Sequence, residues 1–283
     1  MSQTRTARPA PAMALSARTW VMVAIAAVLA VITFCWPLFL APGSALTTND
    51  FAPMLLIGVV GLVVAVITAQ VTGEHSDVKA LALLGVMSAV VAGVRPLGAG
   101  TAGLETVFFP IILSGRVFGP GFGFVLGNTG LFASALLTGG VGPWLPFQML
   151  AAGLVGLGAG LLPQWRGALE VVLLVAYGAV ASFAYGWLMD FSFWPFAAGG
   201  DSQISYDPSA GPGGNLVRFF WFNVATSMGW NLGRAVMTGA LLLVLGPPLL
   251  RVLRRASRRA SFGRASSGLG SSTGRAAGAP TAE

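Results

Sequence analysis

One stretch, residues 104–163, constrains the fold of this chain more than any other. It holds three apolar runs separated by two corners rich in glycine and proline, RVFGPG at 116–121 and LTGGVGPWLP at 137–146. Its only charged residues are Glu105 and Arg116. Apolar runs of this length with turn signals between them are typical of consecutive membrane-spanning helices.

Small residues recur within this stretch at four-residue spacing. The second run carries Gly123 and Gly127, and the third carries Ala152, Gly156 and Gly160. This spacing places small side chains on one helix face, which lets two helix backbones approach closely inside a bilayer. We therefore predict tight helix–helix contacts on these faces.

Composition and charge predict a multi-pass protein of the plasma membrane. The chain is 55% hydrophobic and only 9% charged, whereas a soluble domain carries about a quarter charged residues. Residues 251–283 hold seven arginines and one glutamate, which accounts for most of the net charge of +7. With the positive-inside rule, this tail places both termini in the cytoplasm. No folded basic domain accompanies it, so we expect no nucleic-acid partner.

The fold class we predict is an all-α integral membrane protein with about eight transmembrane helices. Its segments are a disordered cytoplasmic lead (1–18), two N-terminal transmembrane helices (19–73), a six-helix core (79–255) and a disordered basic tail (256–283). A signal peptide is the alternative for 19–41, although that apolar run is longer than a usual signal core. The core spans are expected at LALLGVMSAVVAGV (81–94) and at about 105–118, 121–138, 145–162, 168–189 and 215–250, with the longest loop at 190–214. Pro247-Pro248 should bend or end the last helix.

Several kinds of chemistry lack the residues they need. His75 and Cys35 are the only histidine and cysteine, so a zinc site of these ligands cannot be assembled. The only lysine, Lys79, is followed by alanine and belongs to no phosphate-binding loop. We therefore expect neither an enzyme nor a cofactor, and no catalytic or metal-binding residue. Any transport must draw its energy from an ion gradient or from another subunit.

Few ionisable residues fall within the predicted spans. Arg95 ends the third span, Glu105 begins the fourth, and Arg234 lies about 24 Å up the last helix from its inner end. An arginine in the outer half of the bilayer is costly unless it is paired or faces a cavity, and Glu105 is its natural partner. The pair is either a buried structural ion pair or part of an outward-facing pocket.

A small-molecule site is predicted at the outer level of the helices. Its candidate substrate-binding residues are Arg95, Glu105, Trp144, Gln148, Ser227, Trp230, Asn231 and Arg234. The last four share one helix face by their three- and four-residue spacing. Aromatic walls with a few polar groups suit a small organic ligand. The alternatives are an interfacial tryptophan belt and helix–helix hydrogen bonds from Ser227 and Asn231.

The segment RPLGAGTAGLETVFFPIILSGRVFGPGFGFVLG, followed by SALLTGGVGPWLPFQMLAAGLVGLGAGLLP, resembles substrate-binding S subunits of energy-coupling-factor (ECF) vitamin transporters, in a high-GC Gram-positive branch with two extra N-terminal helices. The resemblance covers about 95–163, with a weaker likeness in WPF (194–196) and TSMGWNLGRA (226–235). It implies a six-helix core that binds one vitamin-like molecule from outside and topples within the bilayer. A transmembrane T subunit and two ABC ATPase subunits would then drive release.

In that family, the first core helix carries small residues that dock on the T subunit. The corresponding helix here offers Gly85, Ala89 and Gly93, which depart from a strict AxxxA pattern. Cobalamin, riboflavin, thiamine or a precursor are all open as ligands. Two other readings are an ion-coupled permease and a membrane assembly protein without a ligand. A permease commonly shows two similar halves and charges at the midplane, and neither is convincing in this sequence.

Overall fold

The computed structural model describes residues 78–98, 103–142, 144–197 and 202–269, together with residues 21, 24, 27, 28, 34–39 and 61. All regular elements in these residues are helices. In chain order they are η1 (Trp36–Phe39), α3 (Val78–Val94), η3 (Arg95–Gly98), α4 (Phe108–Phe118), α5 (Pro120–Thr138), α6 (Leu145–Leu161), α7 (Ala168–Ala197), α8 (Gly211–Thr226) and α9 (Met228–Leu269). The predicted lead and most of the first two predicted spans lie outside the described residues.

Four helices in the described part of the chain are long and apolar enough to cross a membrane. They are the segments Lys79–Gly98, Pro120–Thr138, Ala168–Pro195 and Met228–Arg258. The prediction of an all-helical chain suited to a bilayer is therefore confirmed for these residues. The total of eight spans and the direction of insertion stay predictions.

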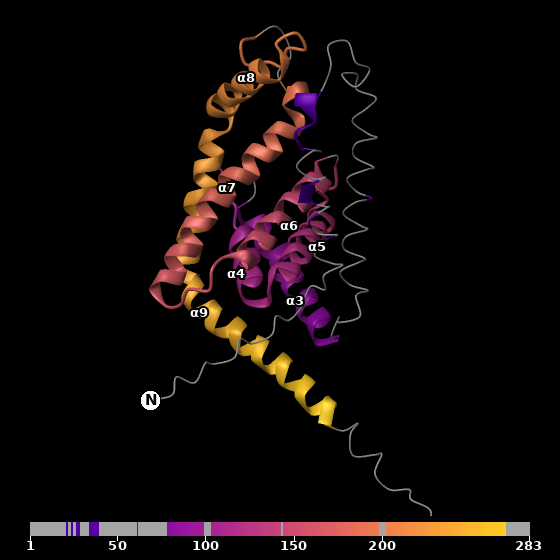
Figure 1. Ribbon diagram of the computed structural model, residues 1–283, viewed down its shortest axis with the longest axis vertical. Helices are drawn as coiled ribbons and strands as arrows, with labels where there is room; N and C mark the ends of the chain where they lie inside the picture. Colours follow the sequence, from indigo (N-terminus) through magenta and orange to yellow (C-terminus); the bar gives the residue numbers. More distant parts are fainter. Residues whose placement is uncertain are drawn as a thin grey trace, which may run out of the picture.

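The fourth predicted span, 105–118, is realised as the short helix α4. Its 11 residues make it about 17 Å long, so it cannot cross a hydrocarbon core of about 30 Å by itself. All of its residues except Val117 are buried. Because α5, α6, α7 and α9 all pack against it, α4 meets protein instead of lipid and forms the centre of the apolar core (Figure 1).

The contact between α5 and α6 depends on glycine. A Cβ atom on Gly123 would lie 2.3 Å from the carbonyl oxygen of Gly156, and one on Gly127 would lie 2.4 Å from that of Ala152. Real Cβ atoms do not come so close, so the backbones touch only because these side chains are absent or small. The tight contacts predicted from the four-residue spacing are confirmed. Gly119, with φ at 103°, turns the chain from α4 into α5.

The predicted final helix, 215–250, is divided into α8 and α9 at Ser227, which has φ of −121° and ψ of −10°. The single long helix was a wrong prediction. The side chain of Thr226 donates a hydrogen bond to the Phe222 carbonyl at 2.7 Å, and such bonds from hydroxyls to the preceding turn compete with the backbone ladder. α8 lies at one end of the molecule, while α9 runs beside α7 to the other end (Figure 1).

α9 bears on two predictions at its C-terminal end. The helix continues through Pro247-Pro248, so of the two outcomes predicted there the end is excluded and the bend stays a prediction. It also includes residues 256–269, where disorder was predicted. Proline removes a backbone donor but its φ angle is compatible with a helix. The following turns are rich in Leu, Arg and Ala, which favour helix, so the helix resumes its bonding after the prolines.

The predicted loop 190–214 is partly helical, because α7 extends to Ala197. Aromatic side chains explain the difference. Phe191 and Trp194 of α7 pack with Phe219 and Phe222 of α8 in a second apolar cluster. Trp194 is fully buried, and its indole N–H donates to the carbonyl of Ile204 at 2.8 Å. This cluster fixes α8 on the end of α7.

Candidate binding pocket

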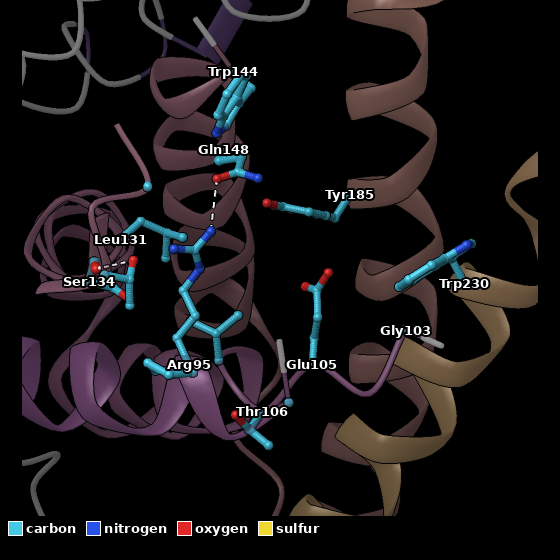
Figure 2. A pocket seen from close by; sticks show the side chains of 15 residues that line it. Arg95, Gly103, Glu105, Thr106, Leu131, Ser134, Trp144, Gln148, Tyr185 and Trp230 are labelled. Carbon is cyan, nitrogen blue, oxygen red and sulfur yellow. Dashed lines mark hydrogen bonds between the residues drawn. The ribbon is translucent and has the colours of Figure 1, made fainter. Parts of the chain in front are cut away.

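A cavity of about 310 Å³ lies where the C-terminal ends of α3 and α5 meet the beginnings of α6 and α9. Side chains of α7 close its remaining side (Figure 2). The lining residues are Arg95, Pro96, Gly98, Gly103, Glu105, Thr106, Val107, Leu131, Ser134, Thr138, Gly140, Trp144, Gln148, Tyr185 and Trp230. The cavity is thus on the α8 side of the bundle.

The structure brings together five of the predicted binding residues. Arg95, Glu105, Trp144, Gln148 and Trp230 come from four different helices and loops, and all line this cavity. Nη2 of Arg95 donates a hydrogen bond to Oε1 of Gln148 at 3.0 Å, which joins the end of α3 to α6. Figure 2 shows Trp144 and Trp230 on different sides of the polar groups.

The predicted ion pair between Arg234 and Glu105 is present. Nη2 of Arg234 lies 2.8 Å from Oε1 of Glu105, and the arginine side chain is 9% exposed, against 32% for the glutamate. The Arg234 guanidinium also lies over the ring of Tyr185, 5.2 Å from its centroid. Glu105 therefore lines the cavity, and Arg234 binds the glutamate from the side away from the cavity.

Three predicted residues lie outside the lining. Asn231 and Arg234 are buried behind the wall, where Nη1 of Arg234 donates to Oδ1 of Asn231 at 2.8 Å. Ser227 sits at the break between α8 and α9. Asn231 and Arg234 therefore position Glu105 and do not themselves reach the cavity.

A buried polar chain continues from this wall toward α8. Asn231 donates to Oδ1 of Asn223 at 3.4 Å, and Asn223 donates to a carboxylate oxygen of Asp190. The sequence placed Asp190 in an outer loop, whereas the structure buries it in α7. The chain links α7, α8 and α9 behind the pocket, so burial of these polar groups is offset by hydrogen bonds.

Sequence reasoning missed four polar side chains of the pocket. The hydroxyl of Tyr185 points into the cavity toward Gln148 (Figure 2). Thr106 and Thr138 line the cavity and donate to the carbonyls of Val94 and Ser134. Ser134 lines it too, and its buried hydroxyl has no hydrogen-bond partner in the described part of the chain. None of the four is charged or part of a motif, so the sequence gives no signal for them.

Two glycines allow close backbone contacts at the rim of the pocket. A Cβ on Gly103, whose φ is 79°, would lie 2.2 Å from the Trp230 carbonyl oxygen. A Cβ on Gly98 would overlap the Leu104 carbonyl oxygen. Residues 99–102, between these two glycines, lie outside the described residues, and no described residue of the predicted long loop 190–214 lines the cavity.

The predicted docking residues are not among the residues that line the pocket. Gly85, Ala89 and Gly93 are exposed on α3, and a Cβ on either glycine would meet nothing within 4 Å. They form an open strip of small residues, and their role in docking stays a prediction. In the described residues, no group of three His, Cys, Asp or Glu side chains could hold a metal ion.

Comparison with family models, curated proteins and solved structures finds no match for this chain.

Proposed function

We propose that this chain is the membrane-embedded binding subunit of an ECF-type importer. It captures a vitamin or related micronutrient from outside the plasma membrane and delivers it inward with a T subunit and two ABC ATPase subunits. The observation that carries this proposal is the cavity between α3, α5, α6, α7 and α9, in which aromatic and charged side chains from distant parts of the sequence converge. Small-molecule sites in proteins are such concave pockets, with aromatic walls and a few converging polar groups.

The shape and lining of the cavity favour a small compound with a flat part. Trp144, Tyr185 and Trp230 offer ring surfaces, while Arg95 and Gln148 offer polar groups. A volume of about 310 Å³ is at the lower end of ligand pockets, which suits a compound with one or two rings. Among the vitamins that the sequence left open, the smaller ones fit best.

Charge distribution supports an outward-facing pocket. Arg166 precedes α7, and Arg251 and Arg255 lie in the C-terminal part of α9; all three are exposed. The start of α7 and the C-terminal part of α9 lie at the end of the bundle away from α8 (Figure 1). The positive-inside rule places that end in the cytoplasm. The cavity would then open toward the outer surface, as capture from outside requires.

Purification of the full chain in detergent, followed by native mass spectrometry and extraction of the bound molecule, tests the proposal. We expect one small molecule per chain, lost in Trp144→Ala and kept in Trp165→Ala. Trp165 is a matched control because its side chain is similarly exposed but lies outside the pocket.

Reconstitution separates the remaining alternatives. In liposomes with an imposed proton or sodium gradient, the chain alone should bind the extracted molecule without accumulating it. Accumulation would identify an ion-coupled permease. Absence of any bound molecule, with Trp144→Ala indistinguishable from wild type, would favour an assembly protein without a ligand.

A further inference from the structure

We propose that the pocket takes an organic monocarboxylate, whose carboxylate accepts hydrogen bonds from Arg95. The inference rests on the proposed function, because it names the chemical class of molecule that the same pocket binds. It follows from the charges around the cavity and from the polar groups that the protein leaves for a ligand.

Arg95 is the charged group of the cavity wall that no described carboxylate pairs with. Glu105, the carboxylate of the lining, is engaged by Arg234, and the deeper Asp190 belongs to the buried polar chain that ends at Arg234. Arg95 forms no salt bridge with any residue that the structure describes. The adjacent segment 99–102 contains no acidic residue. The pocket therefore offers one guanidinium group to a ligand.

Arg95 is held in an orientation that suits a carboxylate. Gln148 accepts one of its hydrogen bonds through Oε1, and this neutral partner fixes the guanidinium without cancelling its charge. The remaining donors of the planar guanidinium match the two oxygens of a carboxylate. An arginine at the end of an apolar helix is stabilised when such an anion pairs with it.

Ser134 gives an independent indication of a polar ligand. Its hydroxyl is fully buried on the cavity wall and has no hydrogen-bond partner among the described residues. Buried polar atoms without a partner are rare in folded proteins. A ligand oxygen in the cavity would provide the partner, and the hydroxyl of Tyr185 points into the same space (Figure 2).

The single arginine left for a ligand favours a carboxylate over other ionic groups. A phosphate monoester carries about −1.5 to −2 charges at neutral pH, more than one guanidinium balances, and would lie near Glu105. An amine would add a second cation beside Arg95. A monocarboxylate with a flat body between the aromatic walls matches the charge of Arg95.

Matched acid and amide probes test this inference on the full-length protein in detergent. The pairs are nicotinate with nicotinamide, benzoate with benzamide, and indole-3-acetate with indole-3-acetamide, and phenyl phosphate is the comparison for benzoate. Calorimetry should show that each acid that binds does so about tenfold or more tightly than its amide, because hydrogen bonds between charged groups are the stronger ones. Phenyl phosphate should bind no better than benzoate.

Two variants locate the effect. Arg95→Gln should abolish the preference for the acid, while Arg166→Gln should keep it, since Arg166 is exposed at the other end of the bundle. Equal binding of acid and amide, tighter binding of the phosphate, or an unchanged preference in Arg95→Gln would overturn the inference and leave the proposed function standing.

If no probe binds, the molecule extracted from the purified protein decides. A carboxylic acid lost from Arg95→Gln supports the inference, and a neutral or cationic molecule overturns it. Absence of any extracted molecule would count against the proposed function as well.

Discussion

Two clusters near opposite ends of the bundle have the same composition and different surroundings. The pocket cluster consists of Arg95, Glu105 and Arg234, and the closed cluster consists of Arg116, Glu170 and Arg254. In the closed cluster both arginines donate to Oε1 of Glu170, at 2.7 and 2.5 Å. In the pocket cluster only one arginine reaches the carboxylate.

The closed cluster uses four of the five N–H donors of Arg116 on protein acceptors. Nε donates to Glu170, and Nη1 and Nη2 donate to the carbonyls of Leu162, Pro163 and Trp165, which follow the end of α6. The side chains of Arg116 and Glu170 are 0% and 2% exposed. The same three charges thus join helices when the buried arginine is held by protein acceptors, and offer a binding group when one arginine faces a cavity.

The largest expected effect comes from breaking the closed cluster. Glu170→Gln removes the carboxylate between two arginines and leaves Arg116 buried without a counter-charge, which should cost about 3–5 kcal/mol of unfolding free energy. Thermal unfolding of the purified protein in detergent measures this loss of stability.

Glu105→Gln is the matched change in the pocket cluster. It should lower stability less, by about 1–3 kcal/mol, because Glu105 is a third exposed and Arg234 keeps its hydrogen bond to Asn231. Equal losses for the two variants would contradict the distinction between a closed cluster and an open one.

The next largest loss of stability is expected from a change in the contact between α5 and α6. Gly156→Ala would place a Cβ 2.1 Å from the Gly123 carbonyl oxygen and force α5 and α6 apart, at a cost of about 1–3 kcal/mol. Gly85→Ala is the control, because its Cβ meets nothing within 4 Å on exposed α3. The control should be neutral or slightly stabilising in the same unfolding experiment. A loss for Gly85→Ala as large as for Gly156→Ala would mean that backbone contact is unimportant here.

The sequence allowed the pocket cluster to be predicted better than the closed one. Arg234 lies deep in an apolar helix, so physical chemistry demanded a partner and Glu105 was the nearest candidate. Arg116 instead lies near the end of one apolar run, and Glu170 lies near the start of another. Charged residues are common at such positions. Only the tertiary approach of α4, α7 and α9 makes them a buried set.

Neither the rotation of α7 about its axis nor the break between α8 and α9 could be predicted from the sequence. Tyr177 and Tyr185 stand in one apolar run, yet Tyr185 lines the pocket while Tyr177 donates to the Val155 carbonyl. Which tyrosine faces the cavity depends on how α7 packs, and an apolar run without periodicity does not reveal it. The break at Ser227 likewise depends on hydroxyl bonds that compete weakly with a helix.

A smaller effect concerns the aromatic wall. Trp230→Ala should weaken binding of the extracted molecule by about 1–3 kcal/mol, the range for stacking on an aromatic side chain. Trp221→Ala is the control, because this tryptophan is also exposed but packs on Phe220 of α8 outside the pocket. Calorimetry measures both. Equal affinities for the two variants would place the ligand elsewhere.

The smallest effect lies at the α8 end, beyond the pocket cluster. Hydrogen bonds from the hydroxyl and backbone N–H of Ser209 lower the pKa of Asp207, with a further contribution from Arg218. A carboxyl with a lowered pKa stabilises the fold above its unfolded value of about 3.9, and this stabilisation is lost as the pH falls through the folded pKa.

Asp207→Asn should therefore speed amide hydrogen exchange in the turn before α8 at neutral pH. Below the folded pKa of Asp207, the wild type and the variant should exchange at the same rate. An identical difference at both pH values would show that charge on Asp207 has no part in holding this turn.

An experimental structure of the protein as purified, with its bound molecule, would show directly which cluster binds a ligand. The expected result is density for one small molecule between Trp144, Tyr185 and Trp230, with an acidic group against Arg95, and an unoccupied closed cluster around Glu170. Density for a ligand elsewhere, or a collapsed cavity in which Arg95 pairs with a protein carboxylate, would contradict it.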